Sequence, residues 1–440
     1  MPRPPAGGIA KPSVLIVVAK WWSLSARLAA ELVRHGWRVS VLCPAGHPIV
    51  HVRDLDRVER YAGIRSLSCL SRTIKSVSPD LVIPCDDGVV AQLHALHELE
   101  PSMRPLIEAS LGDPASFPIV RSRRQLLEAA AHLGIRVPET RRVTSAEEIA
   151  LWHDEKGDAS VVKRDGESGG NGVRVCASLG DAMAAWRELS TPNSLATGVK
   201  RLTIDRDPLA IWQCKHRPVP EITLQRLVDG RPANTMAACL DGEVLAEVSV
   251  IVLAADGPTG AATMIQRISE PRMGHAARLL ARRLKLSGFF GLDFMIEAST
   301  GDPYLIEMNP RCTQLGHLEF LDQGSLAGVF TAKWRGIPLP RATKPIPLAT
   351  IGLFPQALKT LPPDSRRLEG AYVDLPSDQP ALAAELKLDS WPERRWVARL
   401  YHRVRPMVRA ASVEYDQSAV PRNTPPSAAH ARASREAALR

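Results

Sequence analysis

Residues 288–312 read GFFGLDFMIEASTGDPYLIEMNPRC, and this stretch decides how the rest of the chain is interpreted. At its centre, residues 299–303 (STGDP) are turn formers, and a short β-prone run of alternating character lies on either side. The pattern predicts two strands paired as a hairpin. If the turn is centred on Thr300, Asp293 and Glu307 lie opposite each other, and Asn309 follows on the same face.

Two carboxylates that face each other across a sheet repel, so a positive species between them would relieve the arrangement. A hard divalent cation is the natural candidate. A few oxygen ligands, with room left for water and phosphate, suit Mg²⁺ (or Mn²⁺) better than a closed cage does. Arg311 has the same parity and offers a planar fork to a phosphate or carboxylate oxygen. The alternative is an ordinary two-stranded edge with solvated acids.

The acid of GLDF followed by LIEMNPR resembles the metal-binding end of the ATP-grasp superfamily, in its carboxylate–amine-ligase-like and biotin-carboxylase-like members. The resemblance implies that Asp293, Glu307 and Asn309 are Mg²⁺ ligands and that Arg311 is a catalytic contact to the acyl phosphate or the substrate. It also implies a fold of the α/β and α+β classes. In that fold, a parallel α/β domain precedes an ATP-grasp fold, whose two α+β subdomains hold ATP between them.

A glycine-rich loop lies between two β-prone runs in residues 159–176, ASVVKRDGESGGNGVRVC. Glycines let backbone N–H groups approach an anion closely, and Lys163, which ends the first run, adds a positive charge there. The Walker A pattern is absent. The stretch resembles the VVK…SGGxGV element of ATP-grasp proteins. This implies that Lys163 meets the α- and β-phosphates, with a catalytic role, and that the loop with Gly169 and Gly170 closes over the triphosphate. Taken alone, the motif could be a plain flexible turn.

Residues 221–246 predict a strand, a turn at residues 229 and 230, and a further strand pair. They resemble the linker against which adenine lies in ATP-grasp proteins. By position, three residues would line that pocket: Gln225, Arg226 and Val228. Pro232 stands where many members carry a ribose-binding Glu. The ribose contact is therefore open, with Asp229 and Asn234 as candidates.

A helix is predicted for residues 125–133, with Gly134 as its stop. Together with the following IRVPET, it resembles the opening of an ATP-grasp domain, where a basic residue, often Lys, reaches the nucleotide phosphates. Here that place holds Arg123 or Arg124, and a guanidinium can serve a phosphate.

The N-terminal residues predict a βαβ start, with strands at residues 13–19 and 38–43 and a helix at 25–35. There is no G-x-G-x-x-G turn, so nothing specifies a dinucleotide. A later strand ends just before Asp86 and Asp87. At the carboxyl end of an open α/β sheet these acids could bind an amine-bearing substrate. The alternative is that Asp87 caps the following helix.

The composition is that of a globular, multidomain chain of 440 residues. The net charge is 56 − 47 = +9, with much of the visible excess near the C-terminus. Seven scattered cysteines without a C-x-x-C pair favour reduced thiols, hence a cytoplasmic protein, and argue against zinc. The apolar run at residues 14–19 is too short to span a membrane and is predicted as a buried strand. Sparse aromatic residues argue against nucleic-acid binding.

Four regions follow from these patterns: an N-terminal α/β domain (1–110), an ATP-grasp domain (111–335), a small C-terminal region (336–410) and a disordered tail (411–440). Within the third, residues 391–409 are basic and amphipathic. They could lie on an anionic membrane surface or on nucleic acid, or form a solvated helix, which we favour.

The resemblance implies an ATP- and Mg²⁺-dependent ligase that activates a carboxylate as an acyl phosphate for attack by an amine or another nucleophile. The expected partners are therefore small-molecule carboxylates and nucleophiles. A homodimer is one assembly that the sequence permits. Two alternatives remain: a phosphotransferase that uses the same nucleotide site, and a degenerate nucleotide-binding or regulatory protein without catalysis.

Overall fold

The structure is a computed structural model. It describes residues 11–157, 159–166, 170, 172–192, 194–216, 219, 221–320, 324–342, 350–361, 368, 371–390, 393–404 and 412–415.

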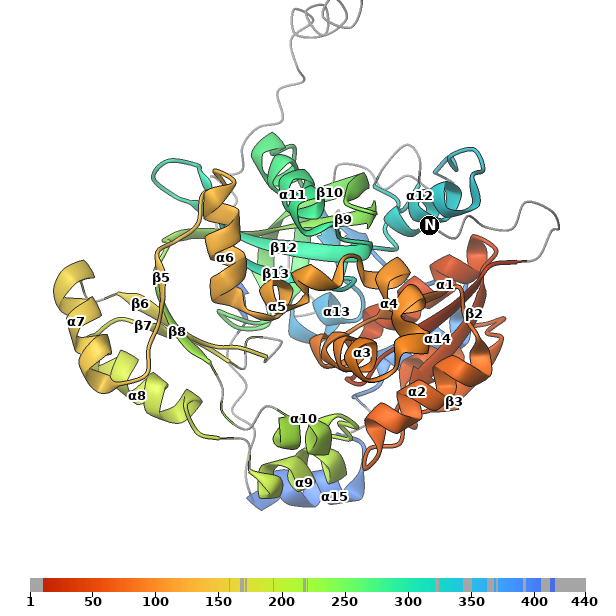
Figure 1. Ribbon diagram of the computed structural model, residues 1–440, viewed down its shortest axis with the longest axis horizontal. Coiled ribbons are helices and arrows are strands. Elements are labelled where there is room, and N and C mark those ends of the chain that lie inside the picture. Colours follow the sequence, from red (N-terminus) through yellow and green to blue (C-terminus); the bar gives the residue numbers. More distant parts are fainter. Residues whose placement is uncertain are drawn as a thin grey trace, which may run out of the picture.

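The N-terminal unit is a parallel sheet covered by helices (Figure 1, red and orange). Its strands lie in the order β3-β2-β1-β4 and all neighbours are parallel. They are β1 (Ser13–Val17), β2 (Arg38–Cys43), β3 (Arg57–Arg60) and β4 (Leu81–Pro84). The helices are α1 (Ser23–Arg34), α2 (Ser66–Val77), α3 (Asp87–Leu99) and α4 (Arg104–Leu111), with short η1 (Pro48–His51), η2 (Pro101–Met103) and η3 (Pro114–Ser116). The predicted βαβ start is confirmed. β1 is buried along its whole length, and apolar after Ser13, because helices cover both faces of the sheet.

A small antiparallel sheet forms a separate lobe on the left of Figure 1. Its order is β5-β8-β6-β7, with β5 (Thr140–Arg142), β6 (Ser160–Arg164), β7 (Val173–Cys176) and β8 (Ile222–Arg226). Helices α7 (Ala146–Lys156) and α8 (Leu179–Leu189) cover it around the buried Trp152. The two β-prone runs around the glycine loop are therefore paired strands, β6 and β7.

The largest sheet has eight strands in the order β13-β12-β9-β10-β11-β14-β15, with β16 paired to β10. Its long strands are β9 (Gly230–Leu240), β10 (Glu243–Ala255), β11 (Ala262–Arg267), β12 (Gly288–Glu297) and β13 (Pro303–Asn309). Shorter strands are β14 (Thr350–Gly352), β15 (Tyr372–Val373) and β16 (Val413–Glu414).

Alternate residues of this sheet enter two different cores, as the two-residue period of a strand requires. Ala237 and Phe290 pack with α6 (Arg123–His132) and α11 (Pro271–Leu284). Their sequence neighbours Met236 and Phe289 pack with α12 (Leu326–Arg335) and with α1. The second face thus lies against the N-terminal unit.

The C-terminal region adds to existing layers. Strands β14 and β15 extend the largest sheet, and α14 (Pro380–Lys387) packs against η1. The remaining helices are α5 (Phe117–Arg121), α9 (Leu195–Thr203), α10 (Ala210–His216), α13 (Gln356–Thr360) and α15 (Trp396–Val404). Two residues of the predicted tail, Val413 and Glu414, form β16. Of the helices in the described residues, none is long and apolar enough to cross a bilayer.

Candidate functional site

The predicted hairpin is present as β12 and β13, and Asp293 pairs with Glu307 as expected. However, Glu307 comes to lie opposite Asp293 for a different reason from the one predicted. Phe294 pairs with Leu305, which centres the turn half a residue before Thr300. A bulge between the Phe294 and Asp293 pairs then makes Ile306 an extra residue and brings Glu307 opposite Asp293.

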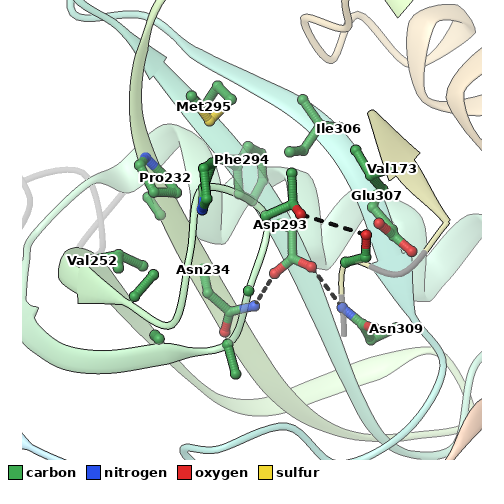
Figure 2. A pocket seen from close by; sticks show the side chains of 18 of the residues that line it. Val173, Pro232, Asn234, Val252, Asp293, Phe294, Met295, Ile306, Glu307 and Asn309 are labelled. Atoms are coloured by element: carbon green, nitrogen blue, oxygen red, sulfur yellow. Dashed lines mark hydrogen bonds between the residues drawn. The ribbon is translucent and has the colours of Figure 1, made fainter. Parts of the chain in front are cut away.

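Asp293 lies between two amide side chains (Figure 2). The Nδ2 atom of Asn234 donates to Asp293 Oδ1 at 2.6 Å, and Nδ2 of Asn309 donates to Asp293 Oδ2 at 2.7 Å. Burial, and then the neighbouring charge of Glu307, raise the pKa of Asp293 to about 6. The two carboxylates therefore repel each other at a position where water does not fully compensate them.

A buried cation lies beside this pair. Arg123, the first residue of α6, donates from Nη2 to Glu307 Oε1 at 3.1 Å and from Nη1 to Asp165 Oδ1 at 2.8 Å. Lys163, at the end of β6, is buried in the same region. Burial, and then repulsion from Arg123, lower the pKa of Lys163 to about 8.

Arg311 connects the hairpin to the N-terminal unit. Its Nη2 donates to Asn309 Oδ1 at 3.0 Å, and its Nε donates to Asp87 Oδ2 at 3.2 Å. Asp87 is not the helix cap considered above, because Asp86 fills that place: Asp86 Oδ1 accepts from the backbone N–H of Val89 at 3.0 Å. Asp87 is left to pair with Arg311.

One cavity of about 350 Å³ collects most of the predicted residues. Those that line it are Arg123, Lys163, Gly170, Gln225, Arg226, Val228, Asp293, Glu307, Asn309 and Arg311. Arg124 is not among its described lining residues, and it pairs instead with Glu128 at 2.6 Å. The structure thus favours Arg123 over Arg124 as the basic residue of the site. Gly169 lies outside the described residues.

Several lining residues were not predicted. Asn234, named above only as a ribose candidate, contacts Asp293 because Asn234 pairs with it across β9 and β12. Asp165 does not line this cavity but contacts Arg123 beside it, and it was missed although it follows Lys163 closely, since its role depends on Arg123. Nothing in the sequence pointed to Trp22 or Tyr415, which come from the two ends of the chain.

The residues fit a divalent cation held together with a nucleotide. Among the described residues, no group of three or more His, Cys, Asp and Glu side chains gathers to hold a metal by itself. The candidate set is two carboxylates with amide oxygens, the donors that Mg²⁺ prefers when phosphate and water complete its shell. Asn234 Oδ1 is buried and has no hydrogen-bond partner among the described residues. A cation between Asp293 and Glu307 would relieve the repulsion of the two carboxylates.

Comparison with known proteins agrees with this geometry. Residues 212–314 match the family model described as the ATP-grasp domain. The chain contains an ATP-grasp domain. The match covers β8 to β13 and the residues just after β13, so it includes the acid hairpin and the linker. No curated protein matches the chain at a significant level.

Solved ATP-grasp structures share the fold over most of the chain. An N5-carboxyaminoimidazole ribonucleotide synthetase with ADP is 19% identical, covering 80% of this chain and 82% of its own, with a TM-score of 0.55. The biotin carboxylase domain of the Hydrogenobacter thermophilus 2-oxoglutarate carboxylase, with MgADP, ADP and bicarbonate, is 12% identical to this chain. The match covers 77% of this chain and 73% of that domain, with a TM-score of 0.54. The Aspergillus clavatus N5-carboxyaminoimidazole synthase with ADP and 5-aminoimidazole ribonucleotide is 14% identical to this chain. The match covers 77% of this chain and 80% of that protein, with a TM-score of 0.55. At these identities the likeness establishes the ATP-grasp fold.

Proposed function

We propose that this ATP-grasp chain is an ATP- and Mg²⁺-dependent ligase that converts a substrate carboxylate into an acyl phosphate, which an amine or another nucleophile then attacks. The observation that carries the proposal is the facing pair Asp293 and Glu307, flanked by amides and two buried cations in one cavity. A purely structural hairpin has no need of two half-buried carboxylates that repel each other.

The chain supplies positioning and charge. Lys163 and Arg123 bind phosphate oxygens, since both are cations that line the cavity. Asp293, Glu307 and Asn309 would hold Mg²⁺, which neutralises phosphate charge when bound. Arg311 orients the substrate carboxylate, and Asp87 fixes the guanidinium from the other side. No cysteine or histidine is among the described lining residues, so alignment and charge neutralisation carry the chemistry.

Calorimetric titration with ATP, with and without Mg²⁺, tests the nucleotide site without knowledge of the substrate. The wild type is expected to bind ATP more tightly with Mg²⁺. Glu307→Gln should lose on the order of tenfold or more of that Mg²⁺ dependence, because even outer-shell partners of a metal cost this much. The matched control is Glu243→Gln, an exposed acid at the start of β10. A wild type that binds no nucleotide would contradict the proposal and favour a degenerate site.

Hydroxylamine trapping separates ligation from phosphotransfer. An acyl phosphate yields a hydroxamate with hydroxylamine, and ADP release then depends on an added carboxylate. A phosphorylated product that is stable to hydroxylamine would contradict the ligase and indicate a phosphotransferase.

A further inference from the structure

The apolar residues that line the cavity come from two sets of elements, which we call its two ends. The first end lies between the small sheet and the acid hairpin, and its walls are Val161, Val175, Leu227, Val228, Met295 and Ile306. The resemblance of the linker, residues 221–246, implies that adenine binds at this end. ATP has a single apolar group, so this end suffices for it.

The second end lies along β10 and β11. Pairing across the largest sheet aligns Glu307, Asp293, Asn234 and Val250 in one row, so β10 is two strands away from Asp293. Val252 lies two residues further along β10, and in Figure 2 it stands on the far side of Asn234 from Glu307. This end is therefore left for an occupant other than the adenine.

Trp22 forms one wall of the second end. It follows β1, at the carboxyl end of the N-terminal parallel sheet, where open α/β sheets receive ligands. Its Nε1 atom is buried without a hydrogen-bond partner among the described residues, and the same holds for Gln314 Oε1. Both residues line the cavity. A donor and an acceptor without a hydrogen-bond partner among the described residues therefore border this end of the cavity.

Tyr415 forms another wall, from the opposite end of the chain. Strand β16 pairs antiparallel with β10, and the backbone N–H of Tyr415 donates to Leu253 O at 3.0 Å. Helix α13 links this segment to the Trp22 loop. Ser412 Oγ donates to Thr360 O at 3.3 Å, and Gln356 Nε2 donates to Ser23 Oγ at 3.0 Å.

We infer that the activated carboxylate belongs to a molecule with an apolar planar body, aromatic in size and carrying a hydroxyl or similar polar group, which binds between Trp22 and Tyr415. The inference rests on the proposed function. Aromatic walls favour a flat apolar group, and the unpartnered atoms of Trp22 and Gln314 select one that both accepts and donates a hydrogen bond. Arg311 then receives the carboxylate at the charged centre.

The test is calorimetry of acetate, phenylacetate and 4-hydroxyphenylacetate with protein saturated with Mg²⁺ and a non-hydrolysable ATP analogue. Phenylacetate is expected to bind at least about tenfold more tightly than acetate, from burial of its ring. The hydroxyl should strengthen binding further. Trp22→Ala and Tyr415→Ala should each weaken the binding of phenylacetate by about tenfold, while the affinity for the nucleotide stays unchanged. Trp22→Phe should restore the affinity for phenylacetate, but it should lose part of the preference for 4-hydroxyphenylacetate over phenylacetate. The control is Trp396→Ala, an exposed tryptophan on α15.

The outcomes distinguish a failure of the inference from a failure of the proposed function. If nucleotide binds with its Mg²⁺ dependence but phenylacetate binds no better than acetate, the inference is overturned and the proposed function stands. The inference is equally overturned if neither Trp22→Ala nor Tyr415→Ala affects phenylacetate binding. If no nucleotide binds, the proposed function fails and the inference fails with it.

Discussion

Lys163 is a buried cation whose charge depends on its neighbours. Its pKa lies at about 8, below the ordinary 10.5, because burial and Arg123 outweigh the attraction of Glu307, Asp293 and Asp165. A phosphate brought close to Lys163 would favour the protonated form. Lys163 is therefore charged without ligand only below about pH 8.

This yields a prediction for pH dependence. Below the free-state pKa, ATP affinity should be independent of Lys163 titration, because the amine is protonated with and without ATP. Above about pH 8, binding must take up a proton, so affinity should fall by up to about tenfold per pH unit. Calorimetry in buffers of different ionisation enthalpy measures the uptake. Lys163→Arg keeps the charge and should abolish it; an uptake that persists in this variant would assign the titration elsewhere.

At the scale of elements, the glycine loop and the loop between β10 and β11 meet. Gly170 has φ +79°, and a Cβ atom there would lie 2.1 Å from the carbonyl oxygen of Thr259. Thr259 Oγ1 donates to Gly170 O at 3.4 Å. Both residues line the cavity, so this contact joins the two loops at its wall.

Gly170→Ala should therefore weaken ATP binding by about tenfold, because the loop must retreat from Thr259 and from the phosphates. The matched control is Gly134→Ala, whose φ is +77° but whose Cβ would meet nothing within 4 Å. Both variants should lose about 1 kcal/mol of unfolding free energy through backbone strain. Only Gly170→Ala should change the ATP titration; equal effects of the two variants would mean that the contact has no role in binding.

At the scale of the molecule, a buried ion cluster ties the N-terminal unit to the C-terminal region. Asp374, which follows β15, accepts from Arg27 of α1 at 2.6 Å and bonds to His317 at 2.7 Å. Burial works against ionisation of Asp374, but His317 and Arg27 outweigh it and hold its pKa below the usual range. The cluster therefore stabilises the packing of α1 against the segment that follows β15.

Asp374→Asn should lower the free energy of unfolding by about 3 kcal/mol, because it leaves Arg27 buried without its counter-charge. Urea unfolding at about pH 7 measures the loss. In the wild type this contribution is fully present above pH 3.8 and is lost as the pH falls through the lowered pKa of Asp374. Asp378→Asn, an exposed acid in the same segment, is the control. A loss no larger than that of the control would show that the cluster is not stabilising.

The sequence by itself determined the local features: the βαβ start, the glycine loop between β6 and β7, and the existence of the hairpin β12–β13. These depend on turn formers and on a two-residue period, which a short window of sequence contains. It also limited the basic residue to Arg123 or Arg124 but could not choose between them.

Only the tertiary structure decided which distant residues complete the site. The bulge at Ile306, rather than the turn, sets Glu307 opposite Asp293. Asn234 reaches Asp293 through the register of β9 on β12, and Arg123 is selected because Asp165 and Glu307 converge on it. Register and convergence are set by how separate segments pack together, and no local period records that packing. For the same physical reason, Trp22 and Tyr415, at opposite ends of the chain, line one cavity without any sign of it in the sequence.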